Sequence, residues 1–310
     1  MNSARVLRLL RISRTVSDLA RAVAFYRDAL DFRVVDNTAH DDEAWGRLMG
    51  IAGARAQSVT MRLGAQEIEL VMFDPPGDPY PSDSSATDHW FQHIAIVVSD
   101  IQAAYTRLCA YSYKPISENG PQQLPPTSGN VIAFKFRDPD GHPLELIQFP
   151  EGTGNGRWRQ KTGLFCGIDH SAIAVGNVER SIDFYTRVLG LRVVSRSVNA
   201  GTEQVRLDYA PDVQVDVIAL QPSSEGPPHL ELLGYERPKG RPIPADVKSS
   251  DVAADRLILQ VNDLNRLFKI IKNEKVIMIS SSVVKLASGQ HAVHVRDPAG
   301  HSLVLVATRS

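Results

Sequence analysis

The sequence predicts an α+β fold built from four copies of one βαβββ module, paired into two curved-sheet half-barrel cavities with helices outside. The first observation is a repeat, because residues 18–35 return in recognisable form as residues 177–194. The second is a turn, Arg-Asp-Pro-x-Gly-His, which occurs at 137–142 and again at 296–301. Self-similarity at a fixed spacing indicates repeated structural modules. The third is a shorter pattern that recurs within each half.

Composition restricts the class of protein before any motif is considered. The chain has 310 residues, 43% hydrophobic and 22% charged, with a net charge of -1, which is typical of a globular protein with about two domains. The absence of a basic block argues against nucleic-acid binding. No apolar run approaches the ~20 residues of a membrane span, and the start lacks signal-peptide features. Two cysteines make no disulfide framework, so we expect a cytoplasmic protein.

Each quarter opens with a short apolar strand that ends in valine, predicted at 12–16, 94–98, 172–175 and 257–261. An Asp or Asn then follows at the position of a helix N-cap. Apolar residues at helical spacing come next, for example Leu19, Val23, Tyr26 and Leu30 in the first quarter. About three strand-like segments complete the unit. One such module cannot bury its sheet alone, so two must pair around a cavity.

The repeat divides the chain into a first domain at 1–150 and a second at 165–310, joined by a glycine-containing linker at 151–164. The modules are expected at about 8–78, 90–150, 166–238 and 253–308. Two further stretches, 75–87 and 226–248, are rich in proline and are interpreted as connecting loops. A lid over the cavity is the alternative role for them.

Two positions in the aligned modules carry polar residues on otherwise apolar strands. Five residues before the first-strand valine stand Arg11, His93, His170 and Arg256. On the last strand, the equivalent position holds Glu69, Glu145, Glu231 and Val304. A carboxylate on a half-buried strand is costly unless a cation, a metal or hydrogen bonds compensate it. One such residue alone would suggest a solvated face, but histidine and glutamate recur together in the second and third modules.

The pairing of modules follows from the charges. Pairing modules one with two and three with four would put an arginine into each candidate site, where its charge would oppose a bound dication. Pairing module two with module three collects His93, Glu145, His170 and Glu231 into one site. Modules one and four would then keep Arg11, Glu69, Arg256 and Val304, a site without a metal in which an Arg–Glu pair serves structure. The sequence therefore predicts one divalent transition metal per chain: Ni, Co, Zn, Mn or Fe(II).

The four modules resemble the vicinal oxygen chelate superfamily, which includes glyoxalase I, extradiol dioxygenases and bleomycin-type resistance proteins. The resemblance covers nearly the whole chain, and the turn and strand at 138–147 and the stretch 170–194 look most like glyoxalase I. It implies that the first-strand His and the last-strand Glu are metal ligands. It also implies bidentate binding of adjacent substrate oxygens to a Lewis-acidic metal, which stabilises an enediolate.

The leading hypothesis is a glyoxalase-like lyase, isomerase or epimerase in which Glu145 or Glu231 leaves the metal and takes a proton next to a carbonyl. A second hypothesis is an Fe(II) dioxygenase of aromatic diols, although a fourth ligand would occupy a position needed for diol or oxygen. A third is a metal-free binding or resistance protein, against which the intact His and Glu positions argue.

The expected partner is a small oxygenated molecule, without nucleic acid or membrane, and a homodimer is the one protein partner left open. Strand alternation places several side chains near the site, and these are candidates for substrate binding: Lys135, Arg137, Gln204, Arg206, His229 and Tyr235. Gln204 and Arg206 are assigned to one face of a strand. His142 and His301, which follow turn glycines, are interpreted as turn residues.

Overall fold

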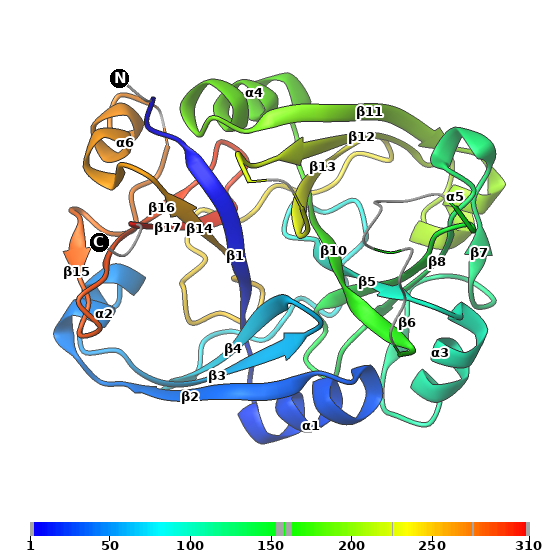
Figure 1. Cartoon of the computed structure of the whole chain (residues 1–310), viewed down its shortest axis with the longest axis horizontal. Coiled ribbons are helices and arrows are strands. Elements are labelled where there is room, and N and C mark those ends of the chain that lie inside the picture. Colours follow the sequence, from blue (N-terminus) through cyan, green and yellow to red (C-terminus); the bar gives the residue numbers. More distant parts are fainter. Residues whose placement is uncertain (1–2, 153–157, 159–162, 225, 275, 308–310) are drawn as a thin grey trace.

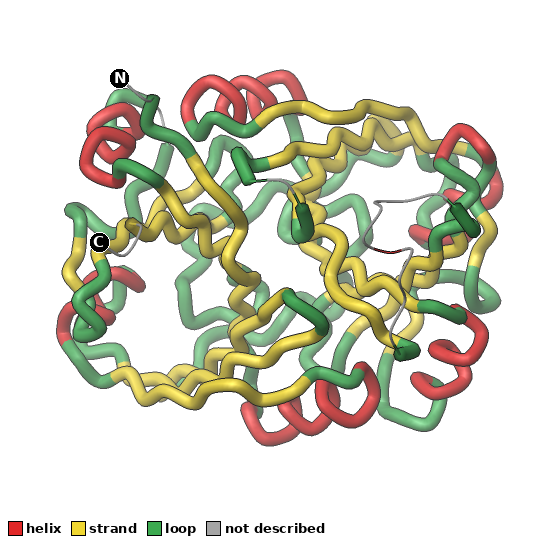
Figure 2. Tube along the Cα trace, viewed as in Figure 1, coloured by secondary structure: helices red, strands yellow, loops and turns green. Residues whose placement is uncertain are grey.

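The computed structural model describes residues 3–152, 158, 163–224, 226–274 and 276–307. It contains two strongly curved mixed sheets with helices on their outer sides, which confirms the predicted α+β fold of four modules (Figures 1 and 2). Most of the predicted linker 151–164 lies outside the described residues. In the described part of the chain, none of the helices is both long and apolar enough to cross a membrane.

The first sheet joins modules one and four, as the pairing argument predicts. Its eight strands run in the order β15-β16-β17-β14-β1-β4-β3-β2. Module one supplies β1 (Val6–Thr15), β2 (Arg33–His40), β3 (Arg55–Leu63) and β4 (Gln66–Asp74). Module four supplies β14 (Arg256–Val261), β15 (Val284–Lys285), β16 (His291–Arg296) and β17 (Ser302–Ala307).

The second sheet joins modules two and three, in the order β11-β12-β13-β10-β5-β9-β8-β6, with β7 paired to β8. Module two supplies β5 (Gln92–Val98), β6 (Lys114–Pro115), β7 (Gln122–Gln123), β8 (Ile132–Arg137) and β9 (Pro143–Gln148). Module three supplies β10 (Phe165–Ala174), β11 (Arg192–Ala200), β12 (Gln214–Gln221) and β13 (His229–Arg237). Each sheet thus combines modules from both halves of the chain, while the domain boundaries proposed from the repeat stay a prediction.

The helices begin where the sequence predicts. Asp18, Asp100, Asn177 and Asp263 each cap a helix, because their side chains accept hydrogen bonds from first-turn N–H groups. The capped helices are α1 (Leu19–Leu30), α3 (Ile101–Leu108), α4 (Val178–Asp183), which continues as a π-helical turn at Phe184–Val188, and α6 (Leu264–Ile271). Two short helices that the sequence pattern does not predict, α2 (Glu43–Met49) and α5 (Thr202–Asp208), stand between strands, and a 3₁₀ turn forms at Pro126–Ser128.

The two sheets share one large apolar core, which fills the space between the outer helices and the convex sides of the strands. Ion pairs on the surface join helices that belong to different sheets. Arg107 of α3 contacts Asp31 at the end of α1 at 2.6 Å, and Arg187 contacts Glu274 at 3.0 Å. The two predicted turn histidines also join modules, and both are buried. His142 bonds the backbone carbonyl of Val252, and His301 bonds that of Ala174. They therefore connect the turn to another module as well as shaping it.

Candidate metal centre

Four strands at the centre of the second sheet bring the predicted ligands together. His93 lies on β5, Glu145 on β9, His170 on β10 and Glu231 on β13. The strand register places each histidine across one intervening strand from a glutamate, with an alanine between them. Ala172 stands between His93 and Glu231. Ala95 stands in the same way between His170 and Glu145. All four ligand candidates line one cavity of about 410 Å³.

The distances suit a single ion. The His93 Nε2 lies 2.8 Å from Glu145 Oε2, and the His170 Nε2 lies 3.5 Å from Glu231 Oε2. Potential ligand atoms of His93, Glu145 and His170 all lie within 4.8 Å of one another. Metal–ligand bonds of about 2.0–2.2 Å at right angles put adjacent donor atoms about 3 Å apart. The two His–Glu contacts are close to this spacing, and Glu231 adjoins the group of three through its contact with His170.

His93 shows that the site fits a metal. Its ring is buried, at 2% exposure, and neither ring nitrogen has a hydrogen-bond partner. The short contact to Glu145 does not supply one, because its direction is wrong for a hydrogen bond. A buried imidazole without partners is costly, and coordination of a cation by its free nitrogen would remove that cost. The donor set, imidazole with carboxylate, is one that transition ions accept.

The electrostatics of the site follow from two imidazoles and two carboxylates that lie close together. Burial opposes charge on His170, yet Glu231, Asp169 and Glu145 together raise its pKa to about 9. Burial and the charge of Lys135 lower the pKa of His93. Burial disfavours the charged carboxylates, but His170 lowers the pKa of Glu231 to about 2, and His93 lowers the pKa of Glu145. Both glutamates are therefore anionic at neutral pH and ready to bind a cation.

Metal affinity should depend on pH for this reason. In the metal-free protein the pKa of His170 is about 9, above the ordinary value of 6.5. Protonation of His170 therefore stabilises the fold fully below about pH 6.5, and this contribution is lost as the pH rises through 9. A metal must displace that proton. We expect the apparent affinity to rise close to tenfold per pH unit between pH 7 and 9 and then to level off. A competition titration with a chelator of known affinity checks this, and an affinity independent of pH over that interval would contradict it.

Residues behind the ligands orient them. Asp169 Oδ2 lies 3.1 Å from the His170 Nδ1, and Asp169 Oδ1 accepts a 2.6 Å hydrogen bond from the Trp158 indole. On the other side, the His229 Nε2 lies 3.2 Å from Glu231 Oε1. Such outer contacts fix the tautomer and direction of metal-binding side chains.

Sequence reasoning missed Asp169 and Trp158. Strict alternation would turn Asp169 away from His170, but the register of β10 against β5 shifts between Ile168 and His170. An irregularity of this kind lets adjacent side chains reach the same side of a sheet. Trp158 comes from the predicted linker, which was assigned no chemical role. The adjacent Asp-His pair was the one signal in the sequence that pointed to a carboxylate partner.

Of the six predicted substrate-binding residues, three line the cavity: Lys135, Gln204 and Tyr235. His229 is on the predicted face and contacts Glu231, without lining the cavity. Arg137 instead bonds the carbonyls of Gly141 and Ser84 and so holds a connecting loop.

The assignment of Gln204 and Arg206 to one strand face is wrong. They lie on helix α5, where residues two apart point to different sides, and Arg206 is exposed outside the cavity. The segment Thr202–Asp208 has seven residues and two strongly apolar ones, Val205 and Leu207. Such a short pattern does not distinguish a helix from a strand.

The equivalent place in the first sheet is built differently. Arg11 lies 3.7 Å from Glu69, which matches the predicted Arg–Glu pair. Arg256 is buried and donates to the hydroxyls of Ser13 and Thr15 and to the carbonyl of Ser249. Val304 packs in an apolar cluster together with Ile258, the counterpart of Ala172. Among the described residues, the two clusters with metal-ligand spacing both lie in the second sheet.

Ala172 should be essential for the space between the ligands, because it is fully buried and stands between His93 and Glu231. We expect Ala172→Leu to weaken metal binding at least about tenfold, since added carbons in a packed site cost about 1–3 kcal/mol. The measurement is metal content after dialysis. Ile258→Leu at the equivalent position of the first sheet is the control and should leave metal content unchanged. Equal metal in both variants would contradict this role.

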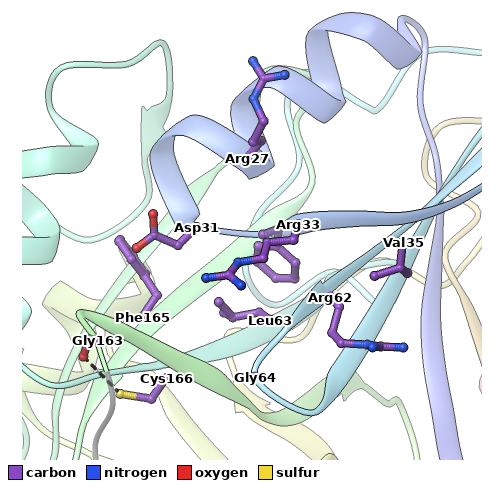
Figure 3. A pocket seen from close by; sticks show the side chains of 11 residues that line it. Arg27, Asp31, Arg33, Val35, Arg62, Leu63, Gly64, Gly163, Phe165 and Cys166 are labelled. Carbon is purple, nitrogen blue, oxygen red and sulfur yellow. Dashed lines mark hydrogen bonds between the residues drawn. The ribbon is translucent and has the colours of Figure 1, made fainter.

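A second hollow, of about 640 Å³, lies outside the candidate metal centre. It forms between α1, the β2–β4 hairpins and the start of β10 and carries three arginines (Figure 3). Arg27 and Arg62 are in ion pairs with Asp28 and Glu67. The hollow is larger than the cavity of the second sheet, but none of the His or Glu residues of the predicted site lines it. Function is therefore assigned to the cavity of about 410 Å³.

Comparisons with known proteins agree with this architecture. A family model described as Glyoxalase/Bleomycin resistance protein/Dioxygenase superfamily matches residues 8–146 and 167–305. A lactoylglutathione lyase of Haemophilus influenzae is 30% identical over 142 residues, which cover 46% of this chain and 93% of that protein.

A lactoylglutathione lyase of Arabidopsis thaliana is 25% identical over 192 residues, 61% of this chain, and the match spans little more than half of the plant protein, 56%. The crystal structure of glyoxalase I from Zea mays superposes with a TM-score of 0.63 at 17% identity, covering 98% of this chain and 92% of the maize chain. That likeness shows a shared fold. With both halves of the sequence matched by one family model, the chain belongs to the glyoxalase, bleomycin resistance protein and dioxygenase superfamily.

Proposed function

We propose that the protein is a metal-dependent lyase or isomerase of the glyoxalase type that acts on a small oxygenated substrate. The observation that carries this proposal is a compact group of His93, Glu145 and His170 in one cavity, which Glu231 also lines, 3.5 Å from His170. The lactoylglutathione lyases that resemble the chain support an enzyme over a binding protein.

The four residues would hold one divalent transition metal, which would act as a Lewis acid toward adjacent oxygens of the substrate. The carboxylates would do the proton transfer. Glu231 is held by two histidines, His170 and His229, whereas Glu145 contacts His93. Glu145 is therefore the carboxylate that moves more easily, takes a proton next to the substrate carbonyl and returns it to the neighbouring carbon.

The test is turnover by protein reconstituted separately with Ni, Co, Zn, Mn and Fe(II). Hemithioacetals of methylglyoxal with several thiols are the first substrates, followed by epimerisable hydroxy acids, with product formation recorded by NMR. Solvent deuterium should appear at the carbon that receives the proton, since the transferred proton exchanges on the glutamate. A protein that retains metal and turns over none of these compounds would contradict the proposal.

One observation favours a second candidate, an Fe(II) dioxygenase. His93, His170 and Glu145 form a compact group of two histidines and one carboxylate, the set that non-haem iron oxygenases use. Oxygen uptake by the iron-loaded protein with catechols or hydroquinones tests it. The presence of Glu231 in the same cavity argues for the lyase or isomerase, because a fourth protein ligand leaves fewer positions for diol and oxygen.

A further inference from the structure

We infer that the cavity is built for an uncharged substrate that carries a hydroxyl or amide N–H, and that this group binds the side chain of Gln204. The inference rests on the proposed function and adds the chemical class of the substrate. It departs from glutathione conjugates, which are anionic. Two independent observations carry it. The first is a hydrogen-bond acceptor in the cavity wall that has no partner. The second is that the lysine an anionic substrate would need is already paired with a carboxylate of the protein.

The acceptor is the amide oxygen of Gln204. The side chain is buried, at 3% exposure, and lines the cavity from helix α5. Its Nε2 donates a 2.7 Å hydrogen bond to Asp208 Oδ2, whereas its Oε1 is buried with no partner. Rotation of the amide would set its oxygen against the carboxylate, so the orientation is fixed. A buried acceptor without a partner costs about 1–3 kcal/mol, which a donor on the substrate would recover.

The cation is Lys135, and Asp208 neutralises it. The Lys135 Nζ donates to Asp208 Oδ1 at 2.6 Å, and Tyr235 donates to Asp208 Oδ2 at 3.1 Å. Burial disfavours the ammonium, yet Asp208 and the nearby glutamates raise the pKa of Lys135, so the ammonium keeps its charge. Among the described residues that line the cavity, Lys135 is the one lysine or arginine.

The remaining charges also leave no cation for the substrate, since Asp169 adds a third carboxylate beside Glu145 and Glu231. Two carboxylates, Glu145 and Glu231, neutralise one dication. A carboxylate on the substrate would then enter a buried site with no free positive charge opposite it, and an unpaired buried charge is costly. The other lining side chains are uncharged, apart from Asp169 and the histidines, and carry hydroxyl, amide, aliphatic or aromatic groups.

Calorimetric binding of hydroxamates to the metal-loaded protein tests the inference without turnover. Hydroxamates chelate metals through two adjacent oxygens, and straight chains of increasing length that end in methyl, hydroxyl or carboxylate differ only at the far end. At the best length, we expect the hydroxyl-ended compound to bind about tenfold tighter than the methyl-ended one, and the carboxylate-ended one to bind weakest. Gln204→Leu should abolish the preference for hydroxyl and leave affinity for the methyl-ended compound unchanged.

Metal content and methyl-ended affinity show that Gln204→Leu has kept its fold. Tightest binding of the carboxylate-ended compound, or a hydroxyl preference that persists in Gln204→Leu, would overturn the inference and leave the metal enzyme intact. Wild-type protein that binds neither metal nor any hydroxamate would instead overturn the proposed function, and this inference with it. The methyl-ended compound separates these cases, because it reports the metal alone.

Discussion

Replacing His93 or His170 with alanine is expected to remove the metal, from about one equivalent per chain to below the detection limit after dialysis. Each side chain offers a buried imidazole nitrogen to the same cavity, and the two rings lie 5.6 Å apart between centroids. Loss of one imidazole leaves the other imidazole and two carboxylates, a smaller set that holds transition ions more weakly. Elemental analysis of the purified variants measures the result.

Arg11→Ala is the matched control, because Arg11 occupies the same position of its module in the first sheet. It should keep the wild-type amount of metal. Loss of metal in only one of the two histidine variants would mean that they do not share an ion. Loss in all three would point to general unfolding, which circular dichroism would reveal.

Replacing Glu145 with glutamine is expected to lower kcat by about 10²–10⁴-fold, the usual range for removal of a general base. Glutamine keeps the shape of the side chain and one oxygen toward the ion, but it cannot accept a proton. KM should change little, since the substrate binds through its oxygens. Steady-state kinetics on the metal-loaded variant, with metal content measured in the same sample, makes the comparison.

Glu231→Gln provides the contrast. Because Glu231 is held by His170 and His229, we expect this variant to lose metal affinity more than kcat per bound metal. A larger fall in kcat per bound metal for Glu231→Gln than for Glu145→Gln would reverse the roles of the two carboxylates. The metal would remain in the same site in either case.

The four ligand candidates could be found from the sequence because each follows from a local rule. Alternation along a strand assigns a face, and the repeat aligns one strand with the next, so the position of Glu145 predicts that of Glu231. The pairing of modules two and three is non-local, but charge decides it, since either sequential pairing would place an arginine beside the ion. The sheet order confirms that pairing.

Other features depend on contacts between distant parts of the chain. Asp169 reaches His170 through an irregular register against β5, and Trp158 reaches Asp169 from the segment between the halves. Helix α5 replaces an expected strand and brings Gln204 and Asp208 to Lys135 of another module. No periodicity within a short window contains that information.

The sequence by itself therefore determined the module, its four copies, the helix caps and the positions of the four ligand candidates, because spacing along one strand or helix encodes them. Tertiary structure decided which side chains complete the cavity. It did so because a buried charge is costly unless a partner meets it, as Asp208 meets Lys135, from which it is separated by 73 residues in the sequence.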